Sequence, residues 1–94
     1  MTPDEVNAIT GRLTATLAEL AAGLRDADHE RWASWVARDC DQVLRGDAHG
    51  LHHFLGAFGG MGSIDDLLLP PPLRERLSSA YADASVLLRE LEAG

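Results

Sequence analysis

Apolar residues recur at every third or fourth position along most of this chain, and this spacing constrains the fold more than any other feature. In the first part of the chain the repeat runs through Val6, Ile9, Leu13, Leu17, Leu20 and Leu24. In the last part it runs through Leu73, Leu77, Ala80, Ala84, Leu87 and Leu91. This spacing places apolar side chains on one face of a helix. We therefore predict an all-α fold.

Capping residues indicate where the outer helices begin. Thr2, Pro3 and Glu5 have the order of a capping box with proline at the first helical position. They predict a first helix that ends near residues 25–26. Pro72 is predicted to start the last helix, because proline suits the first turn and stops whatever precedes it.

The two middle helices are predicted from polar caps and from glycines. Asp28 is expected to cap the second helix, which ends at Gly46. Asp47 is expected to cap a third, shorter helix that ends at Gly59-Gly60. The expected architecture is a single helical domain, residues 1–94. It is a compact bundle of four helices, with a Gly-rich loop and a Pro-rich connector before the last helix.

The stretch AFGGMGSIDDLLL, residues 57–69, interrupts the helical pattern, and we call it the glycine loop. It is followed by three prolines. The structural interpretation is that the glycine pair ends one helix, Met61 fills the core and Gly62 makes a turn. Ser63 would then cap a new helix, and Asp66 would complete a capping box.

A ligand site in the glycine loop is the alternative interpretation. Backbone N–H groups that lead into a helix can bind an anion, but the loop has no lysine, and Asp65 and Asp66 would repel a phosphate. The oxygens of these aspartates and of Ser63 can coordinate a metal. However, the spaced set of ligands and the terminal glutamate of an EF-hand are missing.

The segment FGGMGSIDDL, residues 58–67, resembles the signature of a family of small, uncharacterised bacterial proteins. That signature is Phe/Tyr-Gly-Gly-Met-Gly-Ser-x-Asn/Asp-Asp-Leu, preceded by a tryptophan-containing helix and a Gly-Asp turn. The resemblance extends over residues 31–69, and Asp65 stands where asparagine is equally expected. The resemblance supports the fold and a bacterial origin, and it implies no particular activity.

The net charge of the chain indicates which classes of molecule it is suited to bind. The net charge is −7, and all eight cationic side chains are arginine. Such an acidic chain disfavours nucleic acid and favours a cationic protein partner or a basic small molecule. No apolar run is long enough to cross a membrane. The single cysteine, with no secretory signal at the start, predicts a cytoplasmic protein.

Three histidines and the cysteine are the other candidates for chemistry. His49 and His53 share a helix face, as two metal ligands can, but no glutamate lies between them and no third ligand is evident. With His52 they are expected to form a polar helix side, so we predict no metal and no cofactor. Cys40 lies on an apolar stripe and is expected in the core. We identify no catalytic residue.

The leading functional hypothesis is a small acidic interaction protein, specifically an immunity-type protein that neutralises a toxin by binding it. The contact surface would lie in the arginine-free stretch, residues 47–66. Its candidate residues are Asp47, His49, His52, His53, Ser63, Asp65 and Asp66. The alternative is a homodimeric scaffold module without a ligand. A third hypothesis is a metal- or ligand-binding enzyme centred on the glycine loop, which needs Ser63 or Asp65 to converge with a histidine.

Overall fold

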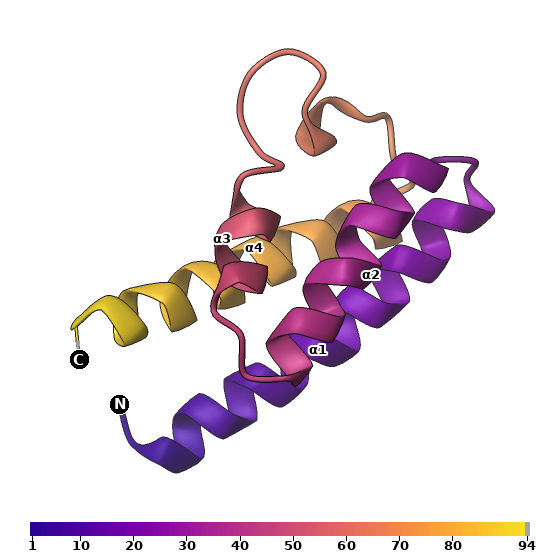
Figure 1. Cartoon of the computed structure of the whole chain (residues 1–94). Helices are drawn as coiled ribbons and strands as arrows, with labels where there is room; N and C mark the ends of the chain where they lie inside the picture. The colour runs from indigo at the N-terminus through magenta and orange to yellow at the C-terminus, as the bar shows by residue number, and fades with distance from the viewer. Residues whose placement is uncertain (94) are drawn as a thin grey trace.

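The computed structural model describes residues 1–93 and confirms the all-α fold class (Figure 1). These residues form four α-helices and one short 3-10 turn. The elements are α1 (Pro3–Asp26), α2 (Glu30–Leu44), α3 (His49–Leu55), η1 (Ile64–Asp66) and α4 (Pro71–Ala93). None of the helices in this part of the chain is long and apolar enough to span a bilayer.

Each of the four helices packs against two others, so that the contacts form a closed ring. Helices α2 and α4 both pack against α1, and the short α3 packs against α2 and α4. Two ion pairs join α1 to α4: Arg12 binds Asp83 through two contacts of 2.8 and 2.9 Å, and Glu19 binds Arg76 at 3.0 Å. The residue further along α1 pairs with the residue that comes earlier in α4, so the two long helices run antiparallel.

The core consists of the apolar stripes that the spacing predicts. Its fully buried side chains include Leu13, Leu17, Leu20, Leu24, Val36, Phe54 and Ile64. Removing each large aliphatic or aromatic side chain from water contributes about 1.5–3 kcal/mol to folding. Leu51 and Phe54 of α3 and Ile64 of the glycine loop belong to this core, so buried apolar side chains anchor both short elements to the bundle.

The predicted start of α1 and the predicted end of α2 agree with the structure. Thr2 Oγ1 accepts the backbone N–H of Glu5 at 3.2 Å, and the Glu5 carboxylate accepts the N–H of Thr2, which completes the capping box. Beyond α2, Gly46 has a φ of +78° and donates to Val43 O. The next N–H, that of Asp47, reaches Gln42 O at 2.9 Å, which closes a Schellman motif.

Three predicted boundaries are wrong. Asp28 does not cap α2; it lies in the preceding turn with a φ of +66°, and His29 is the residue before the helix. Helix α3 ends at Leu55 instead of Gly59-Gly60, because the chain tightens into i→i+3 hydrogen bonds after it. Helix α4 begins at Pro71 instead of Pro72.

Helices α2 and α3 approach each other closely at Gly50. A Cβ atom at this position would lie 2.8 Å from the backbone oxygen of Asp39 and 2.9 Å from Cβ of Gln42. Neither atom is the end of a flexible side chain, so the two helices would have to separate. Gly11 of α1 offers a contrast, because nothing lies within 4 Å of the corresponding position there.

The substitution Gly50→Ala is therefore expected to destabilise the protein by about 1–3 kcal/mol, since it overpacks the contact between α2 and α3. The matched substitution Gly11→Ala is expected to stabilise it by about 0.5–1 kcal/mol, because alanine is the better helix former. Urea denaturation followed by circular dichroism measures both. Equal effects of the two substitutions would contradict the close approach.

Candidate functional site

A shallow groove runs between α2 and α3, and we call it the histidine groove. It encloses about 530 Å³. Its lining residues come from one face of each helix: Trp35, Arg38 and Gln42 from α2, and His49, His52, His53 and the adjoining Gly56 from α3. All three clustered histidines predicted from the sequence thus lie in one groove.

Asp39 lies between the two helices as a fully buried side chain. Its Oδ1 atom forms a short hydrogen bond with Nδ1 of His53, whereas Oδ2 has no hydrogen-bond partner within residues 1–93. Burial raises the pKa of Asp39 to about 6, and the hydrogen bond and charge of His53 offset part of that rise. A carboxylate in this position is costly for the fold, because the desolvation of an ion exceeds what a single partner returns.

His53 is held in place by the neighbouring tryptophan as well. Its ring stacks on Trp35 with a centroid distance of 4.0 Å and an interplanar angle of 16°. The indole Nε1 of Trp35 also donates to the backbone oxygen of His53 at 3.1 Å. The His53 side chain is 36% exposed, so one edge of the ring remains open to the groove.

The other two histidines of the groove are exposed. His49 Nδ1 lies 3.0 Å from Oδ1 of Asp47, and the same oxygen accepts the backbone N–H of His49 at 2.9 Å. Asp47 therefore caps the start of α3 as predicted, although Ala48 stands between it and the first helical residue. His52 makes no side-chain hydrogen bond within the described part of the chain.

Asp39, Trp35 and Arg38 were not predicted from the sequence as members of a site. The signal for Asp39 was present, because it stands three residues after Val36 and four before Val43, on the buried face of α2. A charge inside an apolar stripe implies a partner from another element. Periodicity alone could not say that the partner would be His53.

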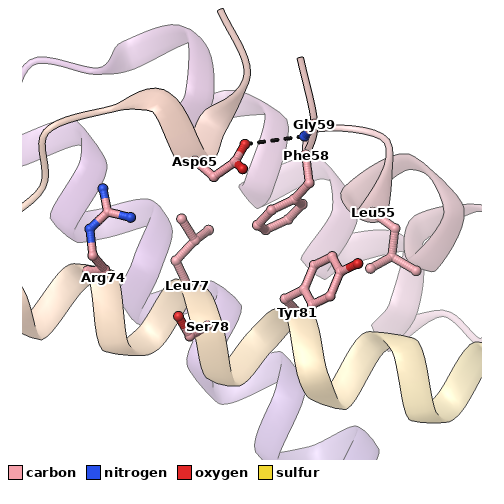
Figure 2. A pocket seen from close by; sticks show the side chains of 8 residues that line it. All are labelled: Leu55, Phe58, Gly59, Asp65, Arg74, Leu77, Ser78 and Tyr81. Atoms are coloured by element: carbon pink, nitrogen blue, oxygen red, sulfur yellow. Dashed lines mark hydrogen bonds between the residues drawn. The ribbon is translucent and has the colours of Figure 1, made fainter. Parts of the chain in front are cut away.

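A second hollow lies beneath the glycine loop, and we call it the loop pocket (Figure 2). It encloses about 510 Å³ and is lined by Leu55, Phe58, Gly59, Asp65, Arg74, Leu77, Ser78 and Tyr81. Phe58 meets Tyr81 edge to face at 4.7 Å. Asp65 lies on the loop side of the pocket, and Arg74 lies on the α4 side, where it donates to the backbone oxygen of Leu67.

The glycine loop is held by its own polar side chains. Asp66 accepts the N–H of Gly62 at 2.8 Å, and Asp65 accepts the N–H of Gly59 at 3.3 Å. Ser63 donates to Asp65 Oδ1 at 2.5 Å and lies 2.8 Å from the carbonyl oxygen of Gly60. The hydroxyl of Ser63 lowers the pKa of Asp65, followed by the N–H of Gly59, so this carboxylate stays ionised at neutral pH.

Part of the structural interpretation of the loop is confirmed and part is wrong. Gly59, Gly60 and Gly62 have φ values of +88°, +82° and +78°, the left-handed conformations that glycine permits. Met61 does not fill the core, because its side chain is 100% exposed. Ser63 precedes η1 but makes no side-chain cap, and the Asp66 carboxylate binds Gly62 where a capping box would bind Ser63.

The predicted contact surface is divided between two places. The three histidines lie in the histidine groove, whereas Asp65 lies on the loop pocket. Within residues 1–93 no histidine lines the loop pocket, and the Ser63 hydroxyl is engaged inside the loop. The convergence that an enzyme centred on the glycine loop requires is therefore not formed there.

Cys40 is buried, as predicted, and its thiol lies 3.4 Å from the backbone oxygen of Thr14. Burial raises the pKa of Cys40, and the charge of Asp41 adds to that rise. The thiol is therefore poorly suited to nucleophilic chemistry.

The raised pKa of Asp39 makes folding depend on pH. The unfolded carboxyl ionises near 4 and the folded one near 6, so the folded state binds the proton more tightly. Wild type should gain about 1–3 kcal/mol of stability relative to Asp39→Asn when the pH falls from 7.5 to 4.5. Urea denaturation in buffer containing a chelator measures this difference. A difference that is constant with pH would show that Asp39 titrates normally.

Comparison with known proteins identifies a family that this chain matches. The model of a domain of unknown function, DUF6966, matches residues 25–72, just over half of the 94-residue chain. No curated protein and no solved structure matches the chain. The matched range includes residues 31–69, on which the sequence resemblance rested, and it contains every residue of the histidine groove. This chain belongs to the DUF6966 family.

Proposed function

We propose that this protein is a small bacterial binding protein that docks onto a cationic protein partner through the glycine loop. We further propose that it acts as an immunity-type protein, which neutralises a toxin by covering its active surface. The observation that supports docking most directly is the exposure of two large apolar side chains on the glycine loop, whose backbone is held by hydrogen bonds within the loop. Met61 is 100% exposed and Leu68 is 97% exposed.

The loop displays these side chains in a defined conformation. Figure 1 shows the segment between α3 and α4 arching away from the helices. Its backbone is held by Ser63, Asp65 and Asp66, so little conformational entropy remains to be lost on binding. Large apolar groups on a preorganised loop are typical anchors of protein interfaces.

The charge around the loop supports a cationic partner. Residues 47–66 contain three aspartates and no arginine, within a chain of net charge −7. Asp65 and Asp66 are exposed on the same loop as Met61. Such a field raises the rate at which a basic surface is encountered and disfavours acidic competitors.

The loop pocket can receive one side chain of that partner. Its volume is in the range of small binding sites, and it combines the rings of Phe58 and Tyr81 with the carboxylate of Asp65. A lysine or arginine of the partner could pair with Asp65 while its aliphatic stem lies against the two rings. Arg74 donates a hydrogen bond to the backbone oxygen of Leu67, and this contact holds the end of the loop against α4.

A photo-reactive amino acid at position 61 is the direct test, used in cells of the source organism to cross-link and identify the partner. We expect a different protein with a basic surface. Binding of the purified pair should weaken at least about tenfold for Met61→Ser and for Leu68→Ser. The matched substitution Leu91→Ser, at an exposed leucine near the end of α4, should leave the affinity unchanged.

Two results would contradict the proposal. A cross-link that joins two copies of this chain would favour the homodimeric scaffold. A partner that binds Met61→Ser and Leu68→Ser as tightly as wild type would show that the loop is not the contact. The immunity role is tested separately: expression of the partner should arrest bacterial growth, and co-expression of this protein should restore it.

A further inference from the structure

We propose that His49 and His53 together bind a divalent transition-metal ion in the histidine groove, with Asp47 and Asp39 orienting their rings. This site is separate from the docking loop and does not depend on the proposed function. It also departs from the sequence interpretation, in which the histidines form a polar helix side without a metal.

The two histidines are spaced for a shared ligand. They are four residues apart on α3, so their side chains leave the same face of the helix one turn apart. Both line the histidine groove. Two histidines at this spacing on one helix face can coordinate the same metal ion.

Each of the two rings is paired with a carboxylate through the same nitrogen. His53 Nδ1 binds Oδ1 of Asp39, and His49 Nδ1 lies 3.0 Å from Oδ1 of Asp47. Histidines that ligate metals almost always donate their other ring N–H to a carboxylate, a backbone carbonyl or water, which fixes the tautomer and makes the free nitrogen more basic. Here both carboxylates occupy Nδ1, and Nε2 is the nitrogen left on both rings.

The position of Nε2 on His53 is restricted further by packing. The ring is stacked on Trp35, and the indole N–H of Trp35 binds the backbone of the same histidine. His49 is different, because its side chain is 85% exposed and held only by Asp47. One ligand is therefore preorganised, and the other can adjust its rotamer to complete the site.

The buried carboxylate is a separate observation that indicates a ligand. Asp39 is fully buried, and its second oxygen has no partner within residues 1–93. An apolar residue of similar size would usually stabilise such a position more than a buried ion does. Orienting and polarising a metal-binding histidine gives this costly carboxylate a role that packing alone does not.

The ligand set determines the class of metal. Two imidazole nitrogens suit Zn²⁺, Cu²⁺ or Ni²⁺, whereas Mg²⁺ and Ca²⁺ require oxygen ligands. In the described residues no set of three His, Cys, Asp or Glu side chains is arranged around one point. The remaining coordination positions would therefore be filled by water, as in metal sites that keep open positions.

Isothermal titration of the tag-free protein with Zn²⁺, and separately with Cu²⁺, tests the site at neutral pH. We expect one ion per chain. Cu²⁺ bound to the protein should show two nitrogen ligands by electron paramagnetic resonance. Binding that does not occur below about 1 mM metal, or a Cu²⁺ spectrum without nitrogen ligands, would overturn the proposal.

Substitutions assign the ligands. His49→Gln and His53→Gln should each weaken binding at least about tenfold, and Asp47→Asn should weaken it by about 10–100-fold, as loss of an orienting partner does. His52→Gln and His29→Gln are the matched controls and should leave the affinity within about twofold. His49 is exposed, so its replacement cannot be confused with loss of the fold, and circular dichroism verifies this.

Two patterns would contradict the assignment to this pair. If His52→Gln weakened binding as much as His49→Gln does, the ion would not lie between His49 and His53. If both His49→Gln and His53→Gln retained wild-type affinity, the metal would be bound elsewhere on the acidic surface.

Discussion

The hydrogen bond between the buried carboxylate of Asp39 and His53 joins α2 to α3, and the geometry of the site depends on it. Helix α3 has seven residues, too few to be stable on its own. Phe54 in the core and the absence of a side chain at Gly50 bring it close to α2. The carboxylate at this contact then requires a donor, which His53 supplies. Trp35 restricts the His53 ring, so packing and electrostatics place the same side chain.

The molecule presents two distinct surfaces that share no lining residue, the histidine groove and the loop pocket. The histidine groove lies entirely within the region that the family model matches. The loop pocket takes Arg74, Leu77, Ser78 and Tyr81 from α4, beyond the matched residues. The matched range covers all of α2, α3 and the glycine loop, whereas most of α1 and of α4 lies outside it. The ion pair between Arg12 and Asp83 fixes the register of α1 against α4.

Helical periodicity was sufficient for the fold class, and local capping residues were sufficient for the start of α1 and the end of α2. Periodicity failed where contacts between distant parts of the chain determine whether a side chain is buried. Met61 is apolar, yet the left-handed glycines on both sides turn it outward. Asp39 is charged, yet its place in an apolar stripe buries it. The histidine cluster was predicted as a group, but its partners could not be, because Asp39 lies fourteen residues away from His53 on another helix.

The central claim is that carboxylates set the tautomer of the groove histidines, and nitrogen NMR of the two rings tests it most directly. Long-range ¹H–¹⁵N correlation spectra of uniformly labelled protein at alkaline pH distinguish a protonated ring nitrogen from a bare one. The account predicts that His53 carries its proton on Nδ1, toward Asp39, and that Nε2 is bare. A His53 ring protonated on Nε2, or one that exchanges freely between both forms as the exposed His52 would, contradicts it.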